Sequence, residues 1–286
     1  MAATYTPIRY PGGKTKLYPE IKAILEGNGL LGHPYAELFA GGAGLAIKLL
    51  LKGDVSSIVI NDYDRAVYCM WDAIVNHGEE LCGFIDSVAL DVATWKVMRG
   101  IYRAHDGVDD FELGKAAFYL NRTNVSGILS GGVIGGLGQT GSYKMGVRFN
   151  RETLKKKVMD IAARRDDIEV TRLDAEEFID KRMGDSELFA YLDPPYVQKG
   201  PGLYRSAFDE GKHRSLAQKI GSAKSKWVVT YDADKLIDDI YGDYGRRDLE
   251  ISYTANVKTV GKEIIILGPG LIWPEGLKQK TSEATL

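Results

Sequence analysis

The chain is predicted to be an α/β protein with a largely parallel sheet, from its composition, its hydrophobic patterning and one glycine-rich turn. Its 286 residues are 44% hydrophobic and 27% charged, which is typical of a globular protein. Short apolar runs alternate along the chain with longer segments of helical period. The turn Gly41–Gly44 lies between the first such run and the first such helix, where an α/β sheet lets a ligand approach the backbone.

The order of the elements follows from the same pattern. A strand over Tyr35–Phe39 leads through the glycines into a helix over Leu45–Lys52, and a second strand, Ser57–Asn61, is followed by Asp64, which can cap a helix that ends near Asn76. Between about residues 79 and 120 the pattern is helical, which indicates an inserted helical lobe. The last two strands are separated by a turn and should form an antiparallel hairpin at one sheet edge. The later strands are expected at Ile168–Arg172, Glu187–Leu192, Lys226–Tyr231, Leu249–Tyr253 and Glu263–Leu267.

Several classes of protein are excluded. The longest apolar stretches, Gly44–Leu51 and Ile264–Trp273, are interrupted and fall short of the 18 or more residues that a membrane span requires. The first residues lack a basic region followed by an apolar run, so we expect no secretion signal and a cytoplasmic protein. Cys69 and Cys82 have neither CxxC spacing nor a nearby His pair, and we therefore expect reduced thiols and no metal site.

The distribution of charge is more informative than its total, a formal −2. Between Lys144 and Arg165 there are eight basic and two acidic residues, and Lys199–Lys226 is basic as well. Such runs are often solvated helix faces, but two together could follow a polyanion. The stretch Gly127–Gly146 holds eight glycines and has no clear period, so we expect a long mobile loop that is either a binding loop or a tolerated insertion.

Two glycine patterns suggest nucleotide-like ligands. Gly13-Lys14-Thr15 matches the end of a P-loop, but Ile8 stands where that pattern needs its first glycine and no strand precedes it. We interpret this segment as a turn that presents an aromatic ring and an ammonium group to a ligand. Asp62 follows Gly42 by twenty residues at the end of the next strand, where it can accept hydrogen bonds from ribose hydroxyls. This spacing suits NAD and S-adenosylmethionine equally, and a plain turn with a capping Asp is the alternative.

The most specific segment is Asp193-Pro194-Pro195-Tyr196, directly after a hydrophobic strand. A Pro-Pro pair at the end of a central strand stops ladder pairing and fixes two φ angles, which makes a rigid hydrogen-bond acceptor. The carboxylate of Asp193 and the carbonyl of Pro194 can each accept a hydrogen bond from an exocyclic amino group. Tyr196 can stack on the ring that bears that amine.

Taken in order, these segments resemble the DNA adenine-specific methyltransferase family, in its Dam-like class, which methylates the adenine N6 amine with S-adenosylmethionine as donor. The resemblance covers about Ile8 to Gly268. The matching segments are Arg9-Tyr10-Pro11-Gly12-Gly13-Lys14, Glu37-Leu38-Phe39-Ala40-Gly41-Gly42-Ala43-Gly44, Asn61-Asp62, Leu120-Asn121-Arg122-Thr123-Asn124, Arg148-Phe149-Asn150, Asp174 and Asp193-Pro194-Pro195-Tyr196.

The resemblance implies a role for each site residue. The expected cofactor contacts are Tyr10, Lys14, Phe39, Gly41, Gly42, Gly44, Asp62, Asp174 and Asp193. Asp193, Pro194, Pro195 and Tyr196 are expected to hold the target base, rotated out of duplex DNA. The expected DNA contacts are Asn121 and Arg122 near the bases, and Lys144, Arg148, Lys155, Lys156 and Lys157 on the backbone.

The expected fold is thus a Rossmann-like methyltransferase core of residues 1–64 and 160–274, a target-recognition lobe of residues 65–159, and a flexible tail of residues 275–286. The expected partner is double-stranded DNA. The protein is expected in a prokaryotic or phage-infected cell, associated with the nucleoid, and restriction-modification is one role that we consider. A monomer is favoured. The alternatives are a same-fold methyltransferase acting on RNA or on protein glutamine, a non-catalytic DNA-binding module and, least favoured, an NAD oxidoreductase.

Overall fold

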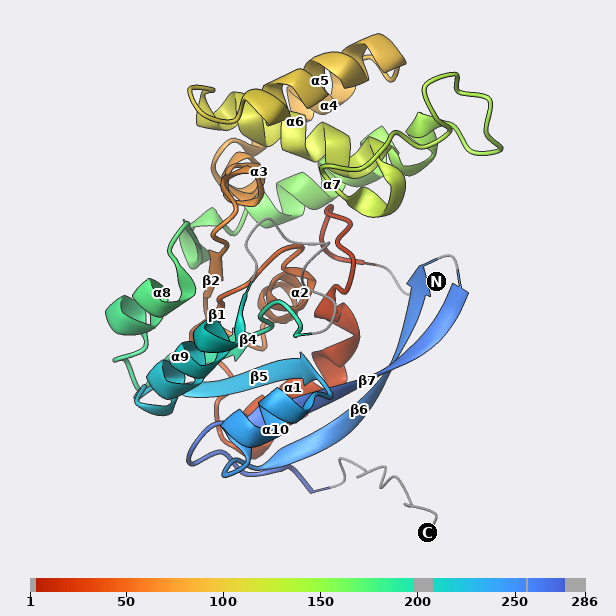
Figure 1. Cartoon of the computed structure of the whole chain (residues 1–286). Coiled ribbons are helices and arrows are strands. Elements are labelled where there is room, and N and C mark those ends of the chain that lie inside the picture. Colours follow the sequence, from red (N-terminus) through yellow and green to blue (C-terminus); the bar gives the residue numbers. More distant parts are fainter. Residues whose placement is uncertain (1–3, 198–207, 256, 276–286) are drawn as a thin grey trace.

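A seven-stranded mixed sheet forms the centre of the protein, within residues 4–197, 208–255 and 257–275, which this computed structural model describes (Figure 1). The strand order is β3-β2-β1-β4-β5-β7-β6. β1 to β5 are parallel, β7 is antiparallel to β5, and β6 pairs antiparallel with β7. The predicted α/β class and terminal hairpin are therefore confirmed. The strands are β1 (Tyr35–Glu37), β2 (Ile58–Asn61), β3 (Ile168–Thr171), β4 (Phe189–Leu192), β5 (Lys226–Asp232), β6 (Arg246–Ala255) and β7 (Val257–Leu267).

Helices connect the strands and build the lobe above them in Figure 1. Those that pack on the sheet are α1 (Tyr18–Gly27), α2 (Gly44–Lys52), α3 (Arg65–Asn76), α8 (Ala175–Arg182), α9 (Glu210–Gly221) and α10 (Lys235–Tyr241). The lobe holds α4 (Gly78–Ser87), α5 (Val92–Ala104), α6 (Asp110–Thr123) and α7 (Arg151–Ala162). The short 3-10 helices are η1 (Lys14–Leu17), η2 (Val125–Gly127), η3 (Met145–Arg148) and η4 (Arg165–Asp167). The wholly helical segment expected between residues 79 and 120 is confirmed.

The core has two parts, one on each face of the sheet, because successive strand side chains point to opposite faces. On β4, Phe189 and Tyr191 pack with α1, α2 and α3, whereas Ala190 and Leu192 pack with α8, α9 and α10. All four β4 side chains are buried, as expected for a central parallel strand covered on both faces.

The terminal hairpin is longer than the apolar pattern indicated. Expected over Leu249–Tyr253 and Glu263–Leu267, its strands cover ten and eleven residues, and the pairing runs from Arg246 opposite Ile266 to Ala255 opposite Val257. Hydrophobic residues mark only the part of a strand that faces a core. Backbone hydrogen bonds continue the ladder beyond that part.

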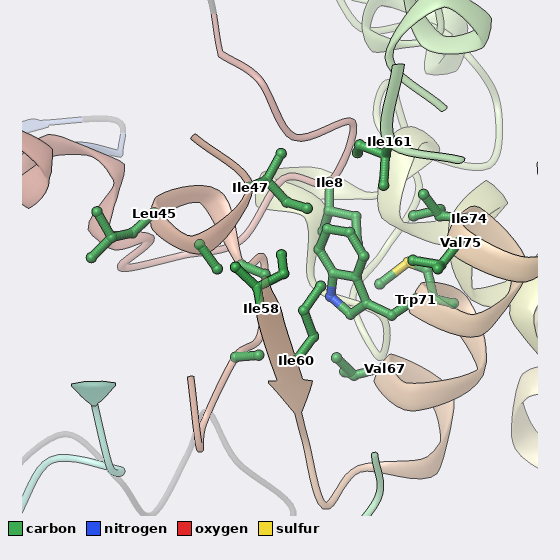
Figure 2. Close-up of a cluster of buried hydrophobic side chains, with 14 of the residues drawn as sticks. Ile8, Leu45, Ile47, Ile58, Ile60, Val67, Trp71, Ile74, Val75 and Ile161 are labelled. Carbon is green, nitrogen blue, oxygen red and sulfur yellow. The ribbon is translucent and has the colours of Figure 1, made fainter. Parts of the chain in front are cut away.

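Helix α3 begins where the sequence indicates. The carboxylate of Asp64 accepts a hydrogen bond from Ala66 N at 2.8 Å, so the predicted N-cap is confirmed. Further along the helix, Trp71 is fully buried among aliphatic side chains that include Ile8, Ile47 and Ile60 (Figure 2). The indole of Trp71 therefore ties α3 to both the N-terminal segment and the sheet.

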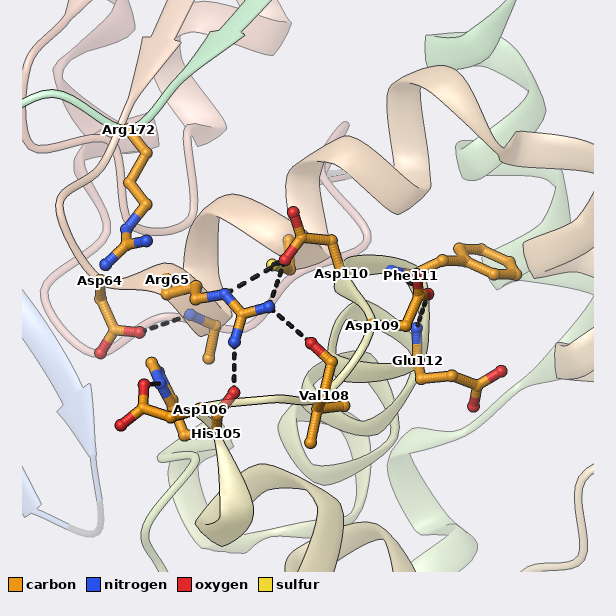
Figure 3. A network of polar contacts seen from close by, with 12 residues as sticks. Asp64, Arg65, His105, Asp106, Val108, Asp109, Asp110, Phe111, Glu112 and Arg172 are labelled. Carbon is orange, nitrogen blue, oxygen red and sulfur yellow. Dashed lines mark hydrogen bonds and ion pairs between the residues drawn. The ribbon is translucent and has the colours of Figure 1, made fainter.

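The first residue of α3 also holds the turn between α5 and α6 (Figure 3). The guanidinium of Arg65 donates to His105 O, to Val108 O at 2.6 Å and to the carboxylate of Asp110. The φ of His105 is +41°, a left-handed conformation that is uncommon outside glycine. Three interactions from one side chain thus fix this turn against the start of α3.

The glycine-rich stretch forms a loop with internal order. Asn124 and Val133 form an isolated antiparallel bridge, and the Gln139 side-chain amide donates to Ile134 O at 2.8 Å. The side chains of Val133 and Met145 are buried. The absence of helix and strand period is therefore explained by turns and a bridge, while mobility of this loop stays a prediction.

Both cysteines are free, Cys69 buried and Cys82 partly buried. In the part of the chain that the structure describes, no helix is both long and apolar enough to span a membrane. Nor do the described residues contain a group of three or more His, Cys, Asp or Glu side chains placed to hold a metal ion.

Candidate active site

The candidate site lies at the carboxyl ends of the parallel strands. β1 has β2 on one side and β4 on the other, so the chain reverses its direction of travel across the sheet at β1. Ligands of open α/β sheets bind outside the strand ends at such a reversal. Here Phe39 follows β1, Asp62 follows β2 and Asp193 follows β4. The topology therefore brings together three residues that the sequence placed in one site.

The glycine turn is anchored on three sides. Gly41 N donates to Asp62 Oδ2 at 2.8 Å, and Trp71 Nε1 donates to Gly41 O at 2.8 Å. Thr6 Oγ1 donates to Gly42 O at 2.9 Å. Gly41 has a φ of +46° and Ala43 one of +38°, and both values lie in the left-handed region. The turn is thus fixed before any ligand arrives.

Close packing explains the glycines of this turn. A Cβ on Gly41 would lie 2.7 Å from the ring of Tyr10, and one on Gly42 would lie 2.8 Å from Tyr10 Cβ. A Cβ on Gly44 would lie 2.1 Å from Thr15 Oγ1. Real Cβ atoms do not come so near, so a side chain here would force the N-terminal segment away. The aromatic residue predicted to join the site therefore packs directly on the glycine turn.

Asp62 has two tasks in the structure. Besides binding Gly41 N, its carboxylate accepts a hydrogen bond from Asp64 N at 3.0 Å, which shapes the turn into α3. Burial raises the pKa of Asp62 to about 7. A carboxylate has about four lone-pair sites, so each oxygen keeps one for a further donor such as a ribose hydroxyl.

Asp193 and Tyr196 lie around the ammonium group of Lys14. Lys14 is only 7% exposed. Its Nζ lies 3.0 Å from Asp193 Oδ1, donates to Tyr196 Oη, and lies 3.2 Å from Glu263 Oε1. Thr230 Oγ1 also donates to Asp193 Oδ1, at 3.0 Å. Pro194 and Pro195 lie between Asp193 and Tyr196 in the sequence, and both are buried. Their fixed φ angles keep this segment rigid.

Lys14 is bonded to side chains of the site. An ammonium group has three donors, and the three bonds to Asp193, Tyr196 and Glu263 use all of them. The expectation was that Lys14 would be presented to the cofactor. In the structure it binds side chains of the site, because burial makes pairing with carboxylates favourable, and its contact with the cofactor stays a prediction.

Phe39 and Asp174 lie at the border of the site. The Phe39 ring makes an edge contact with Phe208, with 5.7 Å between centroids. Asp174 is exposed and caps α8, and its Oδ1 accepts from Glu176 N at 2.9 Å. The neighbouring Leu173 donates its N–H to the side chain of buried Asn61 at 2.8 Å, which keeps Asp174 close to the end of β2.

The sequence analysis assigned no role to three polar residues of this edge. Glu37, on β1, accepts from Ala46 N at 2.8 Å at the start of α2. Thr230, on β5, orients Asp193, and Glu263, on β7, contacts both Lys14 and Tyr196. Each is buried next to apolar residues of its strand, and a polar residue at such a position is the one signal that could have identified them.

Comparison with known proteins identifies the family. A profile of the D12 class N6 adenine-specific DNA methyltransferase matches residues 10–255. The chain belongs to this family. It is 25% identical over 262 residues to the Type II methyltransferase M.CviBI of Paramecium bursaria Chlorella virus NC1A, covering 90% of this chain and 95% of that protein.

Solved structures are more distant. A protein from Pyrococcus horikoshii whose name proposes an RNA methyltransferase, PH1948, has 10% identity and a TM-score of 0.41, with 91% of this chain and 84% of that chain covered. The methyltransferase domain of bacterial-CtHen1-CN has 10% identity and a TM-score of 0.38, with 89% and 100% covered. The assignment as an adenine-specific DNA methyltransferase therefore rests on the family match.

In this D12-class methyltransferase, Asn121 does not lie where a base contact was expected. It is 1% exposed, and its amide is bonded to Arg9 N at 2.9 Å, Arg9 O at 2.7 Å and Gly127 O at 3.0 Å. These bonds join α6 to the N-terminal segment and to η2. The side chain is buried because it supplies hydrogen bonds to backbone groups of two segments that lie outside regular α-helices and strands.

Arg122 lies in a cluster of cations. It donates to Pro7 O and to Arg148 O, each at 2.9 Å, and burial together with Arg9 and Arg148 lowers its pKa to about 9. Arg9 donates to Asn124 O at 3.1 Å, and Lys157 donates to Thr6 O at 3.1 Å. These bonds all go to neutral carbonyls. No ion pair links the four cations Arg9, Arg122, Arg148 and Lys157 to a carboxylate among the described residues.

The other lysines expected to contact DNA differ in whether their charge is paired with a carboxylate. Lys155 binds Asp86 at 2.9 Å and Glu152 at 3.0 Å, and Lys156 binds Asp160 at 2.6 Å. Lys144 donates only to a carbonyl, Gln139 O, within the glycine-rich loop. Because its positive charge is not neutralised there, Lys144 is the better candidate for a phosphate contact.

The residues present fit a cationic methyl donor. Two carboxyl groups, of Asp193 and Glu263, lie within 3.2 Å of one ammonium, that of Lys14, while Asp62 binds the glycine turn and Glu37 binds the start of α2. Burial raises the pKa of each of the four carboxyl groups. The carboxyl groups of Asp62, Asp193 and Glu263 outnumber the single ammonium of Lys14, and this excess of acidic groups is complementary to the positive sulfonium of S-adenosylmethionine.

Proposed function

We propose that this methyltransferase uses S-adenosylmethionine and methylates an adenine that is rotated out of duplex DNA. The observation that supports it most is the arrangement of Asp193 and Tyr196 at the end of β4, next to the glycine turn. A strand end that carries a fixed carboxylate and an aromatic ring suits an amine on a planar base. An adenine inside a duplex is stacked, and rotation out of the helix costs a few kcal/mol.

The residues that would hold the donor are those of the glycine turn and its surroundings. Asp62 would accept hydrogen bonds from the ribose, while Tyr10, Phe39 and the glycines Gly41, Gly42 and Gly44 would line its site, with Asp174 at the edge. When bound, S-adenosylmethionine supplies an electrophilic methyl group on a positive sulfur.

The chain's own contribution is position and polarisation. Asp193 and the carbonyl of Pro194 would accept the two N–H groups of the adenine amine, which increases electron density on the nitrogen lone pair. The ring of Tyr196 would stack on the base, and Pro195 would keep both acceptors in place. Correct placement of two reactants contributes on the order of 7–11 kcal/mol to a reaction of this kind.

DNA would be bound by the helical lobe and the basic surface next to it. The cations Arg9, Arg122, Arg148 and Lys157, which lack carboxylate partners, and Lys144 on the loop would contact phosphates, with smaller shares from Lys155 and Lys156. Since Asn121 is buried, its expected role near the bases becomes that of a support for the segment that carries Arg9.

The domain division follows with one change. We propose a catalytic core of residues 1–64 and 160–274 and a target-recognition lobe from residue 65 to 159, but α3 contributes Trp71 to the core and anchors the glycine turn. The lobe proper therefore starts after α3. The tail expected over residues 275–286 lies, apart from Glu275, outside the described residues.

The test uses the purified protein with radiolabelled S-adenosylmethionine and three acceptors: duplex DNA, RNA and protein. We expect label in DNA, located on adenine N6 by nuclease digestion and chromatography, and no label with Asp193→Ala. Label in RNA or on glutamine would refute the DNA assignment. Binding of DNA without transfer would favour a non-catalytic module. Sequencing of modified adenines in host DNA would then show whether the methylation matches a restriction site.

A further inference from the structure

Glu263 is a second carboxylate of the catalytic centre that the family pattern does not include. It is 1% exposed, and its Oε1 accepts hydrogen bonds from Tyr196 Oη at 2.5 Å and from Lys14 Nζ at 3.2 Å. Its Oε2 has no hydrogen-bond partner among the described residues. Buried polar atoms are nearly always satisfied, so an exception at a catalytic centre needs an explanation.

The sheet register puts Glu263 there. β7 runs antiparallel to β5 and places Glu263 opposite Asp232, the last residue of β5. The end of β5 lies beside the end of β4, where Asp193 begins the turn to Tyr196. The only antiparallel neighbour of the parallel strands in the described sheet thus delivers an acid to the edge where the proposed base site lies.

The local charge is unbalanced. Lys14 lies between two carboxylates, with Nζ 3.0 Å from Asp193 and 3.2 Å from Glu263. One buried cation between two acids is unfavourable for stability, because one negative charge has no counterion of its own. Burial and the nearby Asp193 raise the pKa of Glu263, while Lys14 lowers it. Such an arrangement is expected where function, not stability, selects the residue.

We infer that Glu263 is a positioning residue for base methylation, which draws Lys14 partly away from Asp193 and fixes the phenol of Tyr196. This inference rests on the proposed function, because it needs Asp193 to accept the amine and Tyr196 to stack on the base. Without Glu263, Lys14 pairs with Asp193 alone, and a carboxylate neutralised by its own ion pair is a weaker acceptor. The Tyr196 hydroxyl also loses the acceptor of its hydrogen bond to Glu263, one of the contacts that orient its ring.

Other groups surround this cluster and set its titration. Tyr191 on β4 and Thr230 on β5 bond to each other at 2.8 Å, and Thr230 also donates to Asp193. Asp232 faces Glu263 across the β5–β7 pair, and Glu37 lies on β1 on the other side of β4. None of these groups adds a second cation to the described cluster, so Lys14 is the shared charge.

The test is Glu263→Gln, which keeps the size of the side chain and removes its charge. We expect the single-turnover rate of methylation to fall about tenfold or more, with donor affinity changed less than about threefold. The acidic limb of the rate should move to lower pH, since Asp193 then has Lys14 to itself and its pKa falls. The melting temperature should stay the same or rise, because the uncompensated acid is gone. Glu187→Gln, an exposed glutamate at the opposite end of β4, is the matched control.

A second variant tests the route of the effect. Tyr196→Phe keeps the stacking ring and removes the hydroxyl, so Glu263 can no longer act through it. If Glu263 works through Tyr196 and Lys14, the double variant should be little slower than the slower single variant, because both changes break one network.

Each outcome decides the question. A Glu263→Gln protein that transfers methyl groups within about twofold of wild type, or that melts at lower temperature with an unchanged acidic limb, would show a structural role and overturn the inference alone. A wild-type protein that methylates no DNA would overturn the proposed function, and this inference with it.

Discussion

Glu37 offers a stability measurement that depends on one buried acid. It lies on β1 at 5% exposure, and its Oε1 accepts from Ala46 N at 2.8 Å and from Tyr35 Oη at 3.2 Å. Burial raises the pKa of Glu37 from an ordinary 4.5 to about 8, although the hydrogen bond from Ala46 opposes the rise. Near neutral pH the folded protein therefore holds a proton on Glu37 that the unfolded chain releases.

The sign of the effect follows from linkage. A carboxyl with a raised pKa in the folded state contributes fully to stability below about 4.5, and the contribution is lost as pH rises through about 8. Each pKa unit corresponds to about 1.4 kcal/mol, so the change across this window is on the order of 5 kcal/mol. This is a large part of the stability of an ordinary domain.

The assay is urea unfolding at several values between about pH 5 and about pH 9, for wild type, Glu37→Gln and the control Glu187→Gln. Glutamine keeps an acceptor for Ala46 N but cannot ionise. We expect the free energy of unfolding to fall less steeply with pH in Glu37→Gln than in the other two proteins, by a few kcal/mol over the range. Parallel curves for all three would refute the reasoning, because Glu37 would then have the same charge in the folded and unfolded states.

Three further results are expected. Burial raises the pKa of Asp62 to about 7, so affinity for the cationic donor, measured by calorimetry, should increase between about pH 6 and about pH 8. Asp62→Asn should remove this increase and weaken donor binding by roughly 1.5–3 kcal/mol. Equal donor affinity of both proteins at every pH would exclude the ribose contact. Trp71→Phe removes the hydrogen bond to Gly41 O, and should lower the free energy of unfolding by about 1–3 kcal/mol and weaken donor binding. A loss of stability with unchanged donor affinity would show that this hydrogen bond does not shape the site. Neutralising Lys144 and Arg148 should reduce the slope of log affinity against log salt by roughly 0.9 for each phosphate contact, whereas an unchanged slope would place DNA elsewhere.

The sequence predicted most of the fold because the strands of this protein are either wholly buried or end in recognisable turns. Asp64 and Asp193 could be placed from local pattern, since capping and strand termination depend on near neighbours. The contacts of Glu263 could not be predicted, because they depend on the register of β7 against β5, which no local pattern gives. Trp71 was missed for a related reason: its partner, Gly41 O, lies thirty residues away and accepts through its backbone.

Asn121 shows the opposite difficulty. A polar residue next to an arginine in a helix suggests an exposed surface, and only the tertiary structure reveals that its amide replaces missing backbone partners for Arg9 and Gly127. The bonds of Lys14 could not be predicted for the same reason. The type of residue was informative, but the direction of its ammonium is set by Asp193, which follows β4, and by Glu263 on β7, both far from Lys14 in sequence.

Helix α3 has a consequence for how the two ligands influence each other. Arg65 of this helix is hydrogen-bonded to the α5–α6 turn of the lobe, and Trp71 is hydrogen-bonded to the glycine turn. The N-cap residue of the helix, Asp64, follows Asp62 by two positions. Under the proposed function, a single helix thus links the lobe that would bind DNA to the turn that would bind the donor. Thermodynamic reciprocity then applies: whatever factor the donor contributes to DNA affinity, DNA contributes to donor affinity. Removing the hydrogen bonds of Arg65 to this turn should therefore reduce the effect of the donor on DNA affinity and the effect of DNA on donor affinity by the same factor. The affinity for either ligand, measured without the other, should not change.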